Sequence, residues 1–186
     1  NSFNNLESVN RLLEVGSGSG RLSECILTFY NKINYIICEI PPAMYISFKR
    51  LKLAFPNKKI SLLINNNSKE SLEEEIKNND ISFIFPNQLK LLNNKSFDII
   101  ITINCLHEMN KKVINLYFQL INNLTSNFYF SIWNKTKLID SKTIFKDTER
   151  LDFEKGDYPI PKNWKNIFKE NFIFPSNILS LGYIIK

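Results

Sequence analysis

The segment Leu12-Leu13-Glu14-Val15-Gly16-Ser17-Gly18-Ser19-Gly20 decides the fold that this sequence predicts. The chain has only five glycines, and this segment holds three of them: Gly16, Gly18 and Gly20. An apolar strand is expected before them, over residues 11–15, and a helix after them, over residues 21–31. Glycine at such a junction allows a tight turn and lets the main chain approach a ligand closely. An ordinary connection rarely needs three glycines, so we predict a ligand-binding turn.

Strand-like and helix-like stretches alternate along the rest of the chain. Strands are expected over residues 11–15, 35–38, 59–64, 97–103, 127–133, 172–174 and 181–185. Helices are expected over residues 21–31, 41–54, 68–78 and 111–124, and residues 81–85 are apolar and extended. This alternation predicts an α/β fold with a doubly wound, seven-stranded, mostly parallel sheet whose last strand is antiparallel. Ligands of such sheets bind at the carboxyl ends of the strands.

Composition narrows the function classes. A chain of 186 residues with 44% hydrophobic residues predicts one domain over residues 1–186. The net charge is +6, but no run of basic residues alternates with aromatic ones, so we expect no nucleic acid partner. No apolar stretch approaches the roughly 18 residues of a membrane span, so we expect no membrane partner. Cys25 and Cys38 look like core residues. The three cysteines fit no disulfide or zinc pattern, so we expect a cytoplasmic protein. No pair or triad of residues has a spacing diagnostic of a metal site, so we assign no metal ligands, and a dependence on magnesium stays open.

Glu39, at the end of the second expected strand, supports an adenosyl cofactor. It follows Gly20 by 19 residues, and a carboxylate in that place can accept hydrogen bonds from both ribose hydroxyls. A solvated acid at a strand end is the plain alternative. Enzymes that bind NAD place an acid similarly, but they favour G-x-G-x-x-G, and here Arg21 stands where the third glycine belongs. Arg21 thus argues against a nicotinamide-dependent reductase, but Glu39 fits either cofactor, so this reductase remains a rival interpretation.

The quoted segment resembles the first motif of class I S-adenosylmethionine-dependent methyltransferases. The resemblance implies S-adenosylmethionine as cofactor, with Glu14 orienting its methionine part. The turn residues that would hold that part are Gly16, Ser17, Gly18 and Gly20. Residues 85–89, followed by residues 96–100, look like the adenine-contacting loop of that family. The residues that would lie near the adenine are Asn87, Gln88 and Leu89.

Residues 104–109 follow the strand expected over residues 97–103, in a place that faces the cofactor's methyl group in that fold. Asn104 is expected at the cofactor. Methyl transfer depends mainly on alignment, but a hydroxyl acceptor benefits from a base. Glu108 is the first candidate for that base and His107, with its ordinary pKa near neutrality, the second. Equally, Glu108 can favour the first turn of a helix, and His107 can be a wall residue.

Four segments are similar to the putative sugar O-methyltransferase family of bacterial polysaccharide gene clusters: residues 35–43, 85–89, 106–109 and 172–177. The resemblance covers residues 11–186 and implies methylation of a hydroxyl on a glycan or nucleotide-linked sugar. That family more often has glutamine in place of His107, which places Glu108 first as the base. Its members are longer at the amino end, so we expect this domain to be truncated there.

Residues 134–165 are expected to form an insertion on the acceptor side. Acids and aromatic rings there suit sugar recognition, but they equally suit a surface loop: Asp140, Asp147, Asp152, Asp157, Tyr158 and Trp164. Other readings also remain open. The acceptor can be a small metabolite or RNA, and the chain can be a non-catalytic remnant of the fold.

Overall fold

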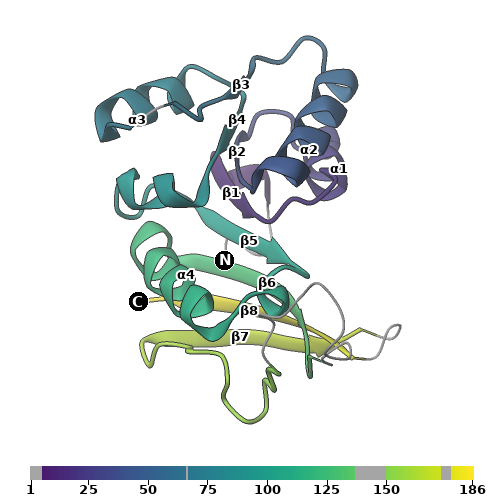
Figure 1. Cartoon of the computed structure of the whole chain (residues 1–186), viewed down its shortest axis with the longest axis vertical. Helices are drawn as coiled ribbons and strands as arrows, with labels where there is room; N and C mark the ends of the chain where they lie inside the picture. The colour runs from purple at the N-terminus through teal and green to yellow at the C-terminus, as the bar shows by residue number, and fades with distance from the viewer. Residues whose placement is uncertain (1–5, 66, 137–149, 173–176) are drawn as a thin grey trace.

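A computed structural model describes residues 6–65, 67–136, 150–172 and 177–186 of the chain. These residues form one eight-stranded sheet in the order β3-β4-β2-β1-β5-β6-β8-β7 (Figure 1). The strands are β1 (Arg11–Val15), β2 (Asn34–Cys38), β3 (Ile60–Leu62), β4 (Ile81–Ile84), β5 (Ile99–Ile103), β6 (Asn127–Trp133), β7 (Trp164–Asn171) and β8 (Ile178–Ile185). Strands β1 to β6 pair in parallel. The last strand, β8, is antiparallel to both of its neighbours, as predicted.

The prediction of seven strands is wrong, because residues 81–84 form a full strand. All four residues of β4 are buried, and β4 pairs with β2 on one side and β3 on the other. A short segment such as Ile-Ser-Phe-Ile does not reveal such pairing, since an extended loop under a helix can have the same composition.

The strand before β8 also lies earlier than expected. β7 spans Trp164–Asn171, whereas the sequence pattern favoured residues 172–174, of which residues 173 and 174 lie outside the described part. β7 is an edge strand with a single partner, β8, and most of its side chains are exposed. An edge strand of this kind carries polar residues and lacks the apolar alternation that identifies a strand in sequence.

Helices cover both faces of the sheet. They are α1 (Arg21–Phe29), α2 (Pro41–Ala54), α3 (Lys69–Lys77) and α4 (Lys111–Leu124), with short 3-10 helices η1 (Leu6–Ser8), η2 (Pro86–Leu91) and η3 (Leu106–Glu108). Figure 1 shows α1 and α2 together on one side of the sheet and α3 on the other. Leu27, Met44 and Leu51 from α1 and α2 join one core cluster, whereas α3 and α4 contribute to the second. Doubly wound sheets have this arrangement.

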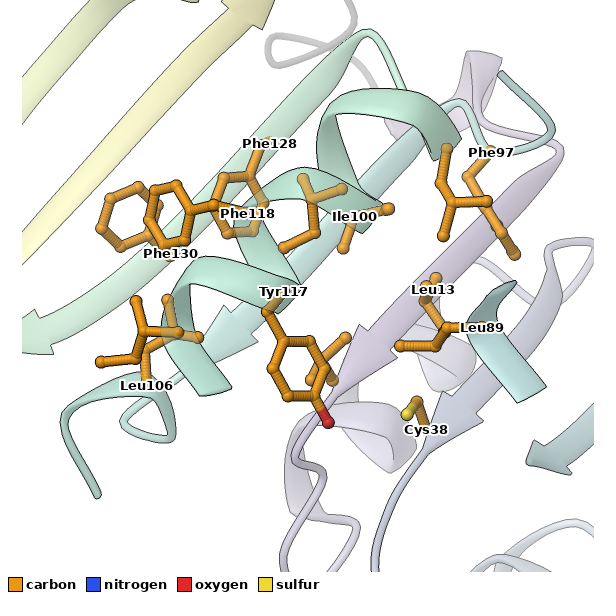
Figure 2. Close-up of a cluster of buried hydrophobic side chains, with 14 of the residues drawn as sticks. Leu13, Cys38, Leu89, Phe97, Ile100, Leu106, Tyr117, Phe118, Phe128 and Phe130 are labelled. Atoms are coloured by element: carbon orange, nitrogen blue, oxygen red, sulfur yellow. The ribbon is translucent and has the colours of Figure 1, made fainter. Parts of the chain in front are cut away.

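The second core cluster is aromatic beneath α4. The ring of Phe118 lies 6.0 Å from that of Phe128, 5.9 Å from Phe130 and 5.2 Å from Trp164. Figure 2 shows Phe118 on α4 between the side chains of the strands, with Tyr117 beside it. Burying each of these rings contributes roughly 1.5–3 kcal/mol. Trp164 thus anchors β7 to the core.

The helix α1 does not bury all of its apolar residues deeply. Leu22 and Ile26 are only partly buried against the core. The structure instead buries Ser23 and Leu27, leaves Cys25 exposed, and leaves Phe29 76% exposed. The expectation that Cys25 is a core residue is therefore wrong, whereas Cys38 is buried as expected. Ser23 is turned inward because its hydroxyl donates to the buried carboxylate of Glu14.

Candidate functional site

The turn between β1 and α1 requires its glycines. Gly16, Gly18 and Gly20 have φ angles of 78°, 54° and 76°, in the left-handed region that disfavours side chains. A Cβ atom on Gly16 would lie 2.2 Å from Sγ of Cys105, and one on Gly20 would lie 3.0 Å from Cβ of Ser47. At Gly18 nothing lies within 4 Å of that position. Neighbouring elements therefore touch the turn at its two ends, while its middle is open.

Glu39 lies directly beside this turn. β1 and β2 are neighbours in the sheet, with Val15 opposite Cys38, so the turn and Glu39 follow adjacent strand ends. Oε2 of Glu39 accepts a hydrogen bond from the Gly18 amide at 2.7 Å, and Oε1 accepts one from the Ile40 amide at 2.8 Å. The hydroxyl of Ser17 donates to the same Oε2 at 3.4 Å. Glu39 is only 8% exposed, so it is no solvated strand-end acid.

Glu14 is turned into the protein. It is 2% exposed, and its Oε2 accepts hydrogen bonds from the hydroxyls of Ser23 and Tyr35. Burial raises the pKa of Glu14 above its ordinary value, the two hydroxyls oppose that shift, and the charge of Glu39 adds to it. The bonded oxygen of Glu14 is therefore committed to α1 and β2.

The residues expected near adenine divide into two buried ones and an exposed one. Nε2 of Gln88 donates to the carbonyl of Leu63 at 2.7 Å, and its Oε1 accepts from the Phe85 amide at 2.7 Å. These bonds join η2 to Phe85, directly after β4, and to Leu63, directly after β3. Leu89 is 1% exposed and belongs to the second core cluster, whereas Asn87 is exposed. Contact of these residues with an adenine stays a prediction.

His107 forms part of a wall. Its ring is 3% exposed and stacks on Trp133, with the ring centroids 4.6 Å apart and the planes 16° apart. Nδ1 of His107 accepts a hydrogen bond from the Trp133 amide at 3.3 Å. Burial lowers the pKa of His107 to about 4, so the imidazole is neutral near pH 7. These contacts favour the wall role that the sequence left open.

Glu108 and Asn104 are the exposed residues of the loop after β5. Asn104 has a φ angle of 52°, and its amide donates to the carbonyl of Ser131 at 2.8 Å. Desolvation raises the pKa of Glu108, and the negative charge of Glu39 raises it further. The Glu108 amide donates to the carbonyl of Cys105 at 3.1 Å, and the Cys105 side chain lies directly against Gly16. The structure thus brings Glu108 and the turn region together.

Sequence reasoning missed the partners that hold these residues in place: Ser23, Tyr35, Cys105 and Trp133. A weak signal was available for Tyr35, which stands in an otherwise apolar strand, because a buried tyrosine hydroxyl usually finds a partner. Cys105 and Trp133 are recognised only through contacts between distant parts of the chain.

The segment expected to form an acceptor-side insertion, residues 134–165, is described at residues 134–136 and 150–165. Lys135 bridges to Asp152 in a short antiparallel contact, and Nζ of Lys111 lies 2.9 Å from Oδ1 of Asp157. Tyr158 is 4% exposed and lies within the core, as does Trp164, so both rings pack inside the protein. Two of the candidate acids, Asp140 and Asp147, lie outside the described residues.

Within residues 6–65, 67–136, 150–172 and 177–186, no group of three or more His, Cys, Asp or Glu side chains could hold a metal ion. In the same ranges, no helix combines the length and the apolar character needed to cross a bilayer.

Comparison with known proteins gives structural matches alone. No family model matches the sequence, and no curated protein matches it either. The PH0226 protein from Pyrococcus horikoshii OT3 is similar in structure, with a TM-score of 0.67 and 13% identity, over 99% of this chain and 85% of that one. The 1,6-didemethyltoxoflavin-N1-methyltransferase of Burkholderia thailandensis, with bound S-adenosylhomocysteine, gives a TM-score of 0.62 and 14% identity over 97% and 73%.

A longer protein matches in the same way. The mitomycin 7-O-methyltransferase MmcR gives a TM-score of 0.59 and 10% identity over 98% of this chain, which spans 50% of that protein. At such identities a structural match shows the fold alone. The predicted α/β class is therefore confirmed, and the chain has the Rossmann-like fold of S-adenosylmethionine-dependent methyltransferases.

Proposed function

We propose that this chain binds S-adenosylmethionine and transfers its methyl group to a hydroxyl of a glycan or nucleotide-linked sugar. One observation carries the cofactor assignment: the open glycine turn after β1 is hydrogen-bonded, through the Gly18 amide, to the acid that ends β2. A turn without side chains suits the amino-acid part of the cofactor, and a neighbouring carboxylate suits the ribose hydroxyls. The methyltransferase fold supports the same assignment.

The charges around the turn suit a positively charged cofactor. The negative charge of Glu39 acts on both Glu14 and Glu108. A sulfonium ion near these carboxylates would be stabilised by their negative charge, whereas the pyrophosphate of a dinucleotide would be repelled. The arrangement therefore favours S-adenosylmethionine over NAD, the rival that the glycine turn left open.

The reaction requires alignment and removal of one proton. The acceptor oxygen attacks the methyl carbon in line with the departing sulfur, the carbon–sulfur bond breaks, and its electron pair stays on the sulfur. The hydroxyl proton passes to a base, for which Glu108 is the proposed residue. Its raised pKa brings it closer to that of a useful base, whereas His107 is buried and its Nδ1 already accepts a hydrogen bond. His107 would orient Trp133 at the acceptor side.

A small-molecule acceptor is the second candidate, because the solved structures with this fold include a mitomycin 7-O-methyltransferase and a toxoflavin-type N1-methyltransferase. Those names describe the acceptors of those proteins. For this chain, the likeness of residues 35–43 and 106–109 to a sugar O-methyltransferase family favours the sugar. RNA is the third candidate. RNA recognition favours basic residues interleaved with aromatic ones, and the sequence has no such run.

Calorimetry with S-adenosylhomocysteine tests the cofactor, and two glycines offer a matched pair of variants. Gly16 and Gly156 both have φ 78°, but a Cβ atom on Gly156 meets nothing within 4 Å. We expect the wild type and Gly156→Ala to bind the ligand and Gly16→Ala to lose binding. Absence of binding to the folded wild type at millimolar ligand would refute the cofactor assignment and favour a non-catalytic remnant.

Transfer of a tritiated methyl group tests the acceptor. Nucleotide-linked sugars, isolated polysaccharide, RNA and small hydroxylated metabolites would be compared with the same enzyme preparation. Label in the sugar fractions, absent with Glu108→Gln, is the expected result. Label in RNA or in the metabolites alone would contradict the sugar assignment while leaving the methyltransferase assignment intact.

A further inference from the structure

A buried polar cluster lies beneath the glycine turn, and we name Glu14, Ser23 and Tyr35 together the Glu14 cluster. Tyr35 is fully buried, Ser23 is fully buried, and Glu14 is 2% exposed. The hydroxyls of Ser23 and Tyr35 both donate to Oε2 of Glu14, the latter at 2.8 Å. A buried carboxylate without such donors would cost several kcal/mol, so the three groups depend on one another.

The cluster joins the three elements that determine the shape of the turn. Glu14 lies on β1, two residues before Gly16. Ser23 lies in the first turn of α1, three residues after Gly20, and Tyr35 lies on β2, opposite Leu12 of β1. The carboxylate therefore ties the start of α1 to β1 and β2, on either side of the glycines.

The main-chain amides of all three glycines donate hydrogen bonds that hold the turn in its shape. The Gly16 amide donates to the carbonyl of Cys38 at 3.0 Å, the Gly18 amide donates to Glu39, and the Gly20 amide donates to the carbonyl of Ser17 at 2.9 Å. The first two bonds join the turn to the end of β2 and to the residue after it, and the third closes the turn directly before α1. Glu39 holds the open middle of the turn directly, whereas the Glu14 cluster holds the strand and helix from which the turn departs.

Packing alone does not explain the cluster. The buried residues of α1 are Ser23 and Leu27, whereas Leu22 and Ile26 pack against the core while only partly buried, and Phe29 is exposed. Buried polar groups that persist in a core often determine one arrangement among several. Ser23 thus occupies a fully buried position of the helix as a donor to Glu14.

We propose that Tyr35 and Ser23 are positioning residues of the cofactor site, which act through Glu14 to hold the glycine turn in its binding shape. The identity of the ligand rests on the proposed function. The effect of the two hydroxyls on the shape of the turn does not rest on the proposed function, because the hydrogen bonds of Glu14 form without a ligand. Neither hydroxyl contacts the open side of the turn, so their removal changes binding only by way of Glu14.

Two measurements on Tyr35→Phe test the proposal, with Tyr183→Phe as the matched control. Tyr183 is also a buried tyrosine, 5% exposed, but it lies on β8 against Trp164. Hydrogen exchange at the amides of Gly16, Gly18 and Gly20 is measured without ligand, and the Kd of S-adenosylhomocysteine is measured by calorimetry. In Tyr35→Phe we expect faster exchange at these amides and about tenfold weaker binding. Neither should change in Tyr183→Phe.

A double-variant cycle tests whether Tyr35 acts through Glu14. If it does, Tyr35→Phe combined with Glu14→Ala weakens binding no more than the stronger single variant, because Glu14→Ala already removes the acceptor of the Tyr35 hydroxyl. Additive losses would overturn the proposal. So would a Tyr35→Phe variant that is less thermally stable but has unchanged glycine exchange and unchanged Kd, since the hydroxyl would then serve the core alone.

Ser23 provides a second route if Tyr35→Phe does not fold. Ser23→Ala removes the other donor, and Ser23→Thr keeps a hydroxyl in the same place, so we expect binding to fall in the first and recover in the second. Equal losses in both would overturn the proposal. If the folded wild type binds no S-adenosylhomocysteine, the proposed function fails. Glycine exchange still decides the positioning role in that case.

Discussion

The carboxylate of Glu39 accepts a hydrogen bond from the main-chain amide of Gly18 at 2.7 Å, across 21 positions of the sequence. An acid expected to hold a ribose is therefore already bonded to the turn expected to hold the amino acid. The two halves of the proposed cofactor site are coupled before any ligand arrives. A change in either half is expected to affect the other, and this coupling underlies the first prediction.

Glu39→Ala is expected to weaken binding of S-adenosylhomocysteine by about 100-fold, because it removes both the proposed ribose acceptor and the partner of the Gly18 amide. Glu39→Gln keeps an acceptor oxygen for that amide, so we expect a smaller loss, about tenfold. Calorimetry of both variants measures the difference. Wild-type affinity in Glu39→Ala would contradict the proposed site.

Gly16→Ala is expected to lower the free energy of unfolding by more than 2 kcal/mol. The left-handed backbone costs about 1–2 kcal/mol for a residue with a side chain, and the contact with Sγ of Cys105 adds to this. Gly156→Ala should show the backbone cost alone, since its φ angle is the same and its surroundings are open. Urea unfolding of the two variants provides the measurement. Equal losses would mean that Cys105 moves aside easily.

Methyl transfer is expected to fall as the pH decreases through the pKa of Glu108, because a base must be ionised to accept a proton. Desolvation and the charge of Glu39 raise that pKa, so the fall should begin above the pH at which an ordinary glutamate titrates. A pH profile of kcat checks this. The acid limb should vanish in Glu108→Gln, along with most of the activity. An acid limb that vanishes in His107→Gln instead would assign the base to His107.

His107 is expected to make the folded protein less stable as the pH decreases. The unfolded chain binds a proton at the ordinary histidine pKa of about 6.5, but the folded protein does so only at about 4. Between these values the unfolded state binds more protons, so the stability falls as the pH decreases, by roughly 3 kcal/mol in total, and levels off below about pH 4.

Melting temperatures of the wild type and His107→Gln between pH 7 and pH 4 test this linkage. The variant has no imidazole, so its melting temperature should decrease less over this range. Parallel curves for the two proteins would show that His107 titrates normally in the folded state, and that its ring is more accessible than its stacking on Trp133 indicates.

Local patterns were sufficient for the centre of the fold. The glycine turn and Glu39 were identified because strand, turn and helix follow one another directly, and the structure places them at adjacent strand ends. β4 was missed because a four-residue segment does not show that it pairs on both sides. β7 was missed because an edge strand keeps polar side chains.

Contacts between distant residues explain the remaining differences. The burial of Ser23 depends on its meeting Glu14, and the burial of Gln88 depends on a carbonyl 25 positions away, at Leu63. The stacking of His107 on Trp133 joins η3 to the end of β6. Periodicity and residue type describe what each segment could contribute. They do not show which segment it will meet.

The placement of β8 between β6 and β7 has a consequence for synthesis on the ribosome. The segment that becomes β7 emerges first, yet its sheet neighbour is the later segment, Ile178–Ile185. Until that segment is available, β6 presents an unpaired aromatic edge to the cell, and such an edge invites pairing with other chains. A nascent chain stalled before residue 178 is therefore the form most prone to aggregate.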